Sequence, residues 1–290
     1  MRYAYYPGCS LHASAREYDT SLRAVCRSLN VELEEVKDWV CCGAPAAHAG
    51  SRRLAAALSL QNLAQVERQG LKEVLVPCAA CFSRFKFAQH DMEEKPGLLG
   101  EMEGLLEHEF QGGVKVLHPL ELLAGDPLLT QLVSLGKGKL SGLKIVCYYG
   151  CLLTRPPKVT GFDNGEYPQS MDRLLRALGA SVLDWGCRTD CCGASFALTR
   201  TDIVLKLSHD ILEGAKEVGA QAIAVACPLC QLNLDSRQGE IEKEYHTRYN
   251  LPVYYFTQLL GLALGVPSRE LMLERHFVDA RRALEKVGIP

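Results

Sequence analysis

The chain reads EVLVPCAAC over residues 73–81 and AIAVACPLC over residues 222–230. Each stretch is a short apolar run that ends in a C-x-x-C motif, so each predicts a buried strand followed directly by two cysteines. The motifs begin at Cys78 and Cys227, which are 149 residues apart. A strand and a motif that recur at this distance indicate a duplicated unit.

The cysteines that precede these motifs repeat in the same order. In each half a lone cysteine comes first, a Cys-Cys-Gly sequence follows, and the C-x-x-C motif closes the pattern. The gaps are 31 and 35 residues in the first half, and 39 and 34 in the second. We name the groups the first sulfur set (Cys9, Cys41, Cys42, Cys78 and Cys81) and the second sulfur set (Cys151, Cys191, Cys192, Cys227 and Cys230).

The composition is that of a globular protein, with 290 residues, a formal net charge of −2, 48% hydrophobic residues and 23% charged residues. Nucleic acid and anionic membrane are not indicated as partners, because both need a basic patch. The N-terminus lacks a signal-peptide pattern, and no apolar run is long enough to span a bilayer. We therefore expect a cytoplasmic protein, in which thirteen cysteines indicate metal or redox chemistry rather than disulfides.

Strands and helices alternate in both halves. This predicts an α/β protein of two pseudo-symmetric Rossmann-like units with small parallel sheets, related by internal duplication. We expect an N-terminal domain over residues 1–136, a C-terminal domain over residues 143–290, and a linker at Gly136–Gly142. A capping box formed by Ser14 and Glu17 is expected at the start of the first helix.

The expected elements match in the two copies. Asp91–Gly113 is expected to be a surface helical excursion and Ser268–Gly288 a terminal helix, while four extra residues of the second copy lie around Cys187–Asp190. The predicted strands are Arg2–Tyr6, Leu33–Trp39, Glu73–Pro77, Val114–Leu117, Lys144–Tyr149, Ser181–Trp185, Ala222–Ala226 and Val253–Phe256. The predicted helices are Ser14–Leu29, Ser51–Gln69, Gln169–Leu178 and Thr201–Val218.

In each copy the lone cysteine, the Cys-Cys pair and the C-x-x-C motif all follow predicted strands. The carboxyl ends of parallel strands form one edge of a sheet, so five thiols are expected to converge there. Thiolates suit iron–sulfur clusters, zinc and copper(I). A thioredoxin-like dithiol would leave six cysteines unexplained. Zinc stays an alternative, although its structural sites use four ligands and adjacent cysteines rarely fit one tetrahedron.

Three further cysteines have a simpler interpretation. Cys26 lies on the apolar face of a predicted helix and Cys147 lies within a predicted strand, so we expect both in the core. Cys187 falls in the insertion before Cys191, where a core or loop position is expected rather than a ligand.

At these residues the chain resembles the B subunit of heterodisulfide reductase, the family with two CCG domains. The resemblance covers nearly the whole length and includes all ten cysteines. It implies two noncubane [4Fe-4S] clusters, one held by each sulfur set. It also implies that the clusters face each other across a cleft and split a disulfide, each taking one sulfur while electrons arrive one at a time.

The resemblance further implies partner proteins. These are a small ferredoxin-like protein with cubane [4Fe-4S] clusters, which is the C subunit of such complexes, and a flavin-containing protein that bifurcates electrons, which is the A subunit. A hydrogenase, a formate dehydrogenase or another oxidoreductase would join them in a larger complex. The substrate would be a small-molecule disulfide or its thiols, with no nucleic acid and no membrane span.

Four polar residues near the cysteines are candidates for proton transfer or substrate binding. His12 and His48 follow cysteines closely and are candidate proton donors, or surface residues at a contact with another protein. Arg155 and Lys158 follow Cys151 and are candidates for binding a substrate carboxylate or phosphate, or members of a solvated loop.

The sequence therefore supports two hypotheses for the function. The leading hypothesis is a cytoplasmic disulfide oxidoreductase of the heterodisulfide reductase type, working as one subunit of a complex. The alternative is a non-catalytic subunit that relays electrons from a flavin or ferredoxin-like partner to another oxidoreductase.

Overall fold

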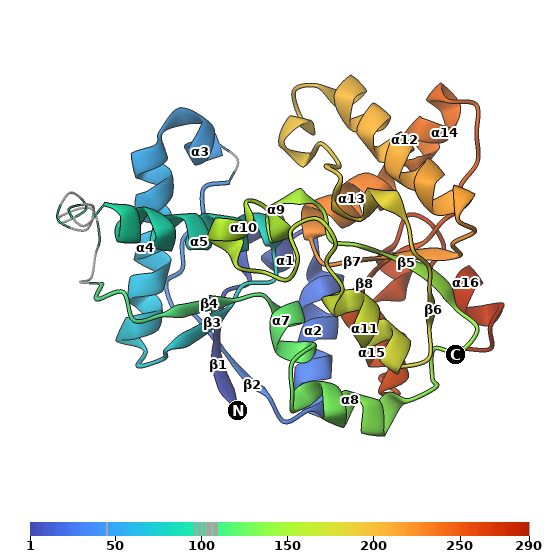
Figure 1. Ribbon diagram of the computed structural model, residues 1–290, viewed down its shortest axis with the longest axis horizontal. Coiled ribbons are helices and arrows are strands. Elements are labelled where there is room, and N and C mark those ends of the chain that lie inside the picture. The colour runs from blue at the N-terminus through green and yellow to red at the C-terminus, as the bar shows by residue number, and fades with distance from the viewer. Residues whose placement is uncertain are drawn as a thin grey trace.

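The computed structural model describes residues 1–44, 46–95, 97, 100, 102, 106 and 110–289. It contains two four-stranded parallel sheets, one in each half of the chain (Figure 1). The first has the order β2-β1-β3-β4 and the second has the same order, β6-β5-β7-β8. The predicted fold class and duplication are thus confirmed. The strands are β1 Arg2–Tyr5, β2 Glu32–Glu35, β3 Glu73–Leu75, β4 Lys115–Leu117, β5 Lys144–Tyr148, β6 Ser181–Val182, β7 Ala222–Val225 and β8 Val253–Tyr255.

Helices connect successive strands, as parallel pairing requires. In the first half they are α1 Gly8–His12, α2 Arg16–Ser28, α3 Ala46–Gly50, α4 Arg52–Arg68, α5 Ala79–Glu94, α7 Pro119–Leu123 and α8 Leu128–Gly136. In the second half the α-helices are α9 Cys151–Thr154, α10 Pro157–Thr160, α11 Ser170–Ala177, α12 Thr201–Glu217, α13 Pro228–Ser236, α14 Gln238–Glu244, α15 Phe256–Ala263 and α16 Arg281–Glu285. The 3₁₀ turns are η1 Gly186–Thr189, η2 Ala194–Phe196 and η3 Leu273–Arg275.

The strands end earlier than the sequence predicts. β2 stops at Glu35, before Asp38, which has a left-handed φ of 52° and turns the chain toward the first Cys-Cys pair. β6 has only two residues, and η1 follows it before the second pair. Longer connections of irregular backbone therefore carry both Cys-Cys sequences beyond the sheet edge.

Two expected helix features are wrong. The Ser14/Glu17 capping box does not form, because α1 occupies the preceding residues and the Ala15 cap position carries no side-chain hydrogen bond. Glu17 is buried and pairs with Arg275 at 3.2 Å.

The second error is the long terminal helix over Ser268–Gly288. That stretch contains only η3 and α16, since backbone amides of Phe277 and Val278 bond to the Asp235 carboxylate at 2.8 and 3.2 Å instead of to a helical turn.

Two further expectations concern connecting segments. The linker at Gly136–Gly142 separates the two sheets, but it is held in place rather than loose: Gly136 ends α8, and buried Leu140 donates its amide to Leu178. The excursion at Asp91–Gly113 begins as the end of α5, and much of it lies outside the described residues.

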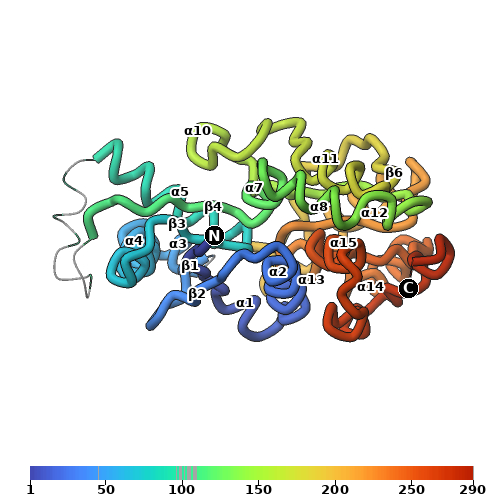
Figure 2. Tube along the Cα trace, turned by 90° about the horizontal axis from the view of Figure 1, so that it is seen from below, coloured from blue at the N-terminus to red at the C-terminus, as the bar shows by residue number. Residues whose placement is uncertain are grey.

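The halves meet through α2 and α15, which lie side by side in the middle of the molecule (Figure 2). The Ser21 hydroxyl on α2 is 2.7 Å from the Thr257 hydroxyl on α15. The Tyr18 ring stacks on that of Tyr255 with 4.3 Å between centroids and 10° between planes. All four side chains are buried, so this contact belongs to the core and holds the two units in one orientation.

The Ser21–Thr257 contact gives a test of how firmly the halves are coupled. Ser21→Ala removes one partner of a buried hydrogen-bonded pair and is expected to lower the free energy of unfolding by ~1–3 kcal/mol. Ser28→Ala, on the exposed side of the same helix, is the matched control and is expected to change it by less than ~0.5 kcal/mol.

Urea denaturation of the two variants measures the difference. The double variant Ser21→Ala/Thr257→Val should lower the free energy of unfolding by less than the sum of the two single variants, because the two hydroxyls are hydrogen-bonded to each other. Strictly additive losses would show that the pair does not couple the halves.

Candidate metal centres

The ends of matching strands bring each sulfur set to one edge of its sheet. Cys9 lies in α1, directly after β1, and Cys151 is the first residue of α9, directly after β5. Cys78 and Cys227 occupy the residue before α5 and α13, just beyond β3 and β7. The expectation that these cysteines share a sheet edge is met in both halves.

The thiols of the first sulfur set form a continuous row. Cys42 Sγ is 3.0 Å from Cys81 Sγ. The Cys41 thiol is near enough to those of Cys9 and Cys42 for both to shift its pKa. The Cys78 and Cys81 thiols likewise shift the pKa of each other. Five sulfur donors therefore lie together although they come from three separate segments of the chain.

The second sulfur set surrounds a cavity. Cys192 Sγ is 3.7 Å from Cys230 Sγ. All five cysteines line a cavity of about 70 Å³, together with side chains such as Tyr149, Leu152 and Ala79. Ala79 belongs to the first half, so the cavity lies where the two halves adjoin.

The two sulfur sets approach each other at Cys78 and Cys227. Both thiols are buried, and they are near enough for each to shift the pKa of the other. Beside them, His118 Nε2 lies 2.8 Å from the Pro77 carbonyl and 3.1 Å from the Ala226 carbonyl. These carbonyls belong to the residues immediately before Cys78 and Cys227, so one imidazole joins the two C-x-x-C turns.

A glycine precedes the lone cysteine in each half and permits its close approach to the other thiols. Gly150 has φ 69° and ψ −176°, a region open essentially to glycine alone. A Cβ atom on Gly150 would lie 3.1 Å from Cys230 Sγ, and one on Gly8 would lie 3.4 Å from Cys81 Sγ. Side chains at these positions would intrude on the space beside the sulfur atoms.

A pair of tyrosines fixes the Cys-Cys sequences at matching points. Tyr6 donates to the Val40 carbonyl at 2.8 Å, and Tyr148 donates to the Asp190 carbonyl at 2.7 Å. Each acceptor immediately precedes its Cys-Cys pair. The repeated bond shows that the duplication extends to the supports of the cysteines as well as to the strands.

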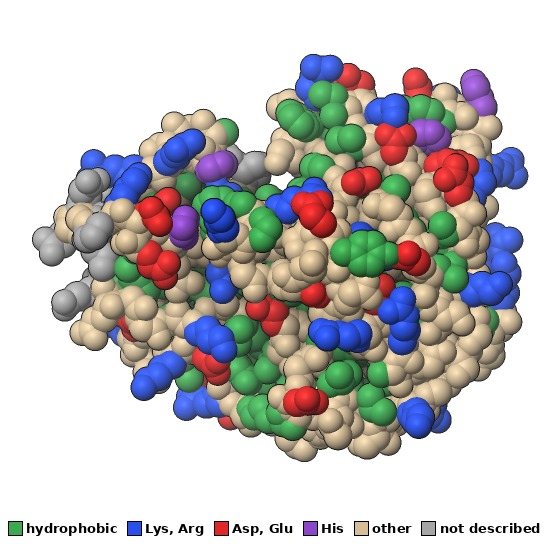
Figure 3. Space-filling view, in the orientation of Figure 1, with side chains coloured by type: hydrophobic (Ala, Val, Ile, Leu, Met, Phe, Trp, Pro, Cys, Tyr) green, Lys and Arg blue, Asp and Glu red, His purple; other side chains and the backbone are tan. Residues whose placement is uncertain are grey.

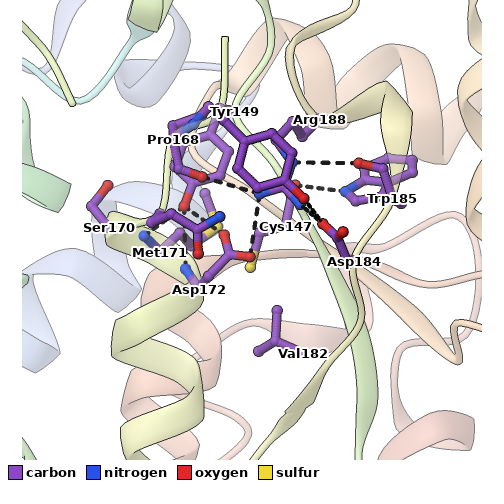
Figure 4. Close-up of polar contacts among 12 residues, drawn as sticks. Cys147, Tyr149, Pro168, Ser170, Met171, Asp172, Val182, Asp184, Trp185 and Arg188 are labelled. Atoms are coloured by element: carbon purple, nitrogen blue, oxygen red, sulfur yellow. Dashed lines mark hydrogen bonds and ion pairs between the residues drawn. The ribbon is translucent and has the colours of Figure 1, made fainter. Parts of the chain in front are cut away.

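The four-residue insertion in the second copy is a rigid support built around Arg188 (Figure 4). The Arg188 guanidinium is 2% exposed and pairs with Asp172 at 3.5 Å and with Asp184. Its backbone carbonyl accepts the Tyr149 amide at 2.8 Å and the Gly150 amide at 3.2 Å. The insertion thus ties the strand end before Cys151 to the segment that leads into Cys191.

Neighbouring thiols lower the pKa of three cysteines, Cys42, Cys191 and Cys227, below the ordinary value of a thiol. The hydrogen bond with the Cys81 thiol lowers the pKa of Cys42 to about 7. The hydrogen bond with Cys151 lowers the pKa of Cys191 to about 6, and Gly193 N–H adds a bond to its sulfur at 3.3 Å. Since metals bind the thiolate, one member of each Cys-Cys pair is prepared for coordination.

The cysteines outside the sulfur sets lie where they were expected. Cys26 and Cys147 are core residues, each 1% exposed. Cys187 lies in η1, with its sulfur 3.9 Å from the Asp210 carbonyl on α12. All thirteen cysteines are free thiols.

The four polar candidates are placed around the sets without forming one group. His12 is exposed at the end of α1 and its ring meets the Trp39 edge at 5.8 Å. His48 is exposed on α3. Partial loss of water around its ring lowers its pKa, and the charges of Arg84 and Arg52 lower it further. Arg155 is already engaged, with Glu166 at 2.6 Å and Thr189 Oγ1 at 3.0 Å. Lys158 is exposed on α10.

Sequence reasoning missed several residues that shape the site. His118 gave no signal, because its role depends on a contact between the halves. Arg84 and Asn233 each follow a C-x-x-C motif by three residues, and an alignment of the two copies would have drawn attention to them. Arg188 stood within the recognised insertion but has no counterpart in the first copy.

The residues present fit iron–sulfur clusters held by cysteine. Each half offers five soft donors carried by the segments that follow its strands, and the second set lines one cavity. Within the described ranges, no group of three or more His, Cys, Asp or Glu side chains is arranged so that it could hold one metal ion.

Comparison with known proteins places these features in a family. The family described as a cysteine-rich domain, CCG, matches residues 3–86 and 145–235, which contain the two sulfur sets. The chain is 32% identical to the 8-methylmenaquinol:fumarate reductase membrane anchor subunit of Wolinella succinogenes, covering 97% of this chain and 98% of that protein. It is 27% identical to the B subunit of the ferredoxin/F(420)H(2)-dependent CoB-CoM heterodisulfide reductase of Methanosarcina acetivorans, covering 97% and 95%.

A solved structure supports the fold. A hypothetical protein from Helicobacter pylori superposes with a TM-score of 0.76 over 96% of this chain, at 11% identity, and this chain spans 52% of that one. Separately, the described part of the chain contains no helix that is both long and apolar enough to cross a bilayer.

The glycine before Cys151 provides a test that leaves every cysteine in place. Gly150→Ala is expected to remove the second centre alone and to lower the iron content from about eight to about four atoms per chain. Gly219→Ala is the control, because Gly219 also has a positive φ of 76° but an added Cβ meets nothing within 4 Å.

Iron and acid-labile sulfide are quantified after anaerobic purification of both variants. Full iron content in Gly150→Ala would show that the space beside Cys230 is not needed by a bound group.

Proposed function

Because this chain belongs to the family of proteins with cysteine-rich CCG domains, we propose that it is an iron–sulfur subunit of a heterodisulfide-reductase-type complex. In this proposal the two sulfur sets hold two noncubane [4Fe-4S] clusters and the protein reduces a disulfide to two thiols. The observation that carries it is the buried His118 imidazole, whose Nε2 lies 2.8 Å from the Pro77 carbonyl and 3.1 Å from the Ala226 carbonyl and so holds the two C-x-x-C turns next to each other.

The number of donors supports a cluster with more than four thiolates. Ordinary [4Fe-4S] clusters and structural zinc each use four cysteines, whereas each set here has five cysteines, with one Sγ–Sγ pair at 3.0 Å in the first set and one at 3.7 Å in the second. When bound, two such clusters would supply one electron each, which matches the two electrons that a disulfide needs. Reduction of one disulfide then consumes two electrons and two protons and yields two thiols.

The protein's own residues would hold the reactants in place. Cys9, Cys41 and Cys191 are exposed, so both sulfur sets reach the surface. The molecule is hollowed between the lobe that carries α3 and the lobe that carries α12, at the top of the view in Figure 3. The proposed substrate, a small disulfide, would enter from this hollow and meet both sets.

Protons and substrate anions need side chains near the same face. His12 and His48, both exposed and close in sequence to the first sulfur set, stay our candidates for proton donors. Arg155 and Lys158 stay candidates for binding an anionic group. For Arg155 to bind such a group, its ion pair with the exposed Glu166 would have to break.

We extend the proposal to location and partners on the basis of the resemblance to the B subunit of heterodisulfide reductase. A cytoplasmic setting would keep all thirteen cysteines reduced. A ferredoxin-like [4Fe-4S] protein and a flavin protein would deliver electrons, within a larger complex that can include a hydrogenase, a formate dehydrogenase or another oxidoreductase.

A second candidate is favoured by one of the relatives. The 32% identical protein of Wolinella succinogenes is named as part of a quinol:fumarate reductase, not of a disulfide reductase. In this alternative the two clusters relay electrons between partner proteins and meet no small substrate. The close approach of the two sulfur sets would serve either function.

Metal analysis tests the cofactor. The anaerobically purified chain should contain about eight irons and eight sulfides and no zinc. Cys192→Ser should lose the second centre and retain about half of the iron. Cys26→Ser is the control, since Cys26 lies on α2 in the hydrophobic core and is in neither sulfur set, and it should retain both centres. Stoichiometric zinc, or full iron in Cys192→Ser, would contradict the ligand assignment.

Turnover by the native complex separates the two candidates. With reduced methyl viologen as electron donor, a disulfide reductase should oxidise two viologens for each disulfide consumed and release two thiols. CoB–CoM heterodisulfide, cystine and glutathione disulfide are the test substrates. Reduction of fumarate with no reaction toward any disulfide would favour the relay.

A further inference from the structure

The two halves are alike in backbone but carry different charges at matching positions beside the sulfur sets. Arg84 lies three residues after Cys81, one turn into α5. Asn233 lies three residues after Cys230, one turn into α13. The repeat therefore places a guanidinium in the first half where the second half has a neutral amide.

In the second half this side chain contacts the second cysteine of the Cys-Cys pair. Asn233 Nδ2 donates to the Cys192 carbonyl at 3.0 Å and lies 3.6 Å from Cys192 Sγ. Arg84 occupies the matching point of α5, one turn after Cys81, whose Sγ is 3.0 Å from Cys42 Sγ. Hence the first sulfur set has a nearby cation at a point where the second has a neutral hydrogen-bond donor.

The position of Arg84 keeps its charge close to the sulfur atoms. It is half-buried, and it lines a cavity of about 290 Å³ with His48, Arg52 and Asp91. Its acidic neighbours are Cys42 and Asp91. Because water screens a half-buried charge less than an exposed one, Arg84 acts on the first set more strongly than a surface arginine would.

A second matched pair differs in the opposite sense. Val40 and Asp190 each precede a Cys-Cys pair, and the carbonyls of both accept a tyrosine hydroxyl, so the two positions are equivalent. Asp190 is the residue directly before Cys191, so its carboxylate adds a negative charge beside the second sulfur set. The second sulfur set thus has an added negative charge where the first set has an apolar residue.

We propose that these two substitutions give the centres different reduction potentials, with the first sulfur set holding the higher-potential centre. Cluster potentials depend on the charge around the cluster and on hydrogen bonds to its sulfurs. Reduction adds negative charge, which a nearby cation stabilises and a nearby carboxylate opposes. Arg84 and Asp190 therefore shift the two centres in opposite directions, although neither is a ligand.

This inference rests on the proposed function and adds an order of events to it. A donor that supplies electrons one at a time would place the first electron on the centre beside Arg84 and the second on the centre beside Asp190. With equal potentials the two centres would fill at random. The charges thus break the symmetry that the duplication created.

A redox titration of the purified chain with both centres tests the proposal. Dithionite serves as the reductant in the presence of mediator dyes, and EPR and visible absorbance follow the centres. Two separate one-electron steps are expected. The Cys192→Ser protein, which lacks the second centre, should retain the higher-potential step.

The matched substitutions assign the cause. Arg84→Asn, which copies the second half, should lower the ratio of reduced to oxidised first centre about tenfold at a fixed potential, a shift of about 59 mV. Arg84→Lys keeps the positive charge and should therefore leave the potential of the first centre close to that of the unsubstituted protein. Asp190→Val, at an exposed site, should raise the lower step and leave the higher one unchanged.

Arg282→Asn removes the same charge from an exposed position on α16 and should move neither step. Full iron content with one shared midpoint for both centres would overturn this inference and leave the proposed function standing. An Arg84→Asn protein in which the lower step moves and the higher does not would overturn it as well. A chain without iron would overturn both.

Discussion

The arrangement of the ten thiols depends on one buried imidazole. His118 is fully buried and lies between two carbonyls that can only accept hydrogen bonds, so its Nε2 must carry the proton that both share. Its Nδ1 accepts the Leu120 amide at 3.1 Å, which requires the same tautomer. Burial lowers the pKa of His118 to about 4, and the ring stays neutral. The two C-x-x-C turns are therefore held at a fixed separation by a group that does not ionise at neutral pH.

Around this bridge the molecule repeats its supports and varies its charges. The strand order, the glycine before the lone cysteine and the tyrosine bond to the residue before the Cys-Cys pair recur in both halves. Only the second half has the Arg188 insertion with its buried ion pairs. Since the backbone frame is shared, differences in electrostatics between the sites come from a few side chains, Arg84 and Asp190 among them.

Much of this could be predicted from the sequence, because the deciding signals are local. Apolar strands ending in cysteine fix the sheet edge, and the repeated spacing fixes the number of sets. Predictions that depended on tertiary contacts were wrong. Glu17 pairs with Arg275 instead of forming a capping box with Ser14, and the Asp235 carboxylate accepts backbone amides where a terminal helix was predicted. The role of His118 was likewise out of reach, since Pro77 and Ala226 lie far from it in sequence.

The central claim is that each sulfur set holds one iron–sulfur cluster through all five of its thiols. A crystal structure of the anaerobically purified protein, with anomalous difference maps at the iron edge, tests this most directly. The account predicts two separate groups of iron peaks, one in each half, with every cysteine of the set bonded to iron. A single group of peaks, a zinc signal in either half, or any of the ten sulfurs turned away from the metal would contradict it.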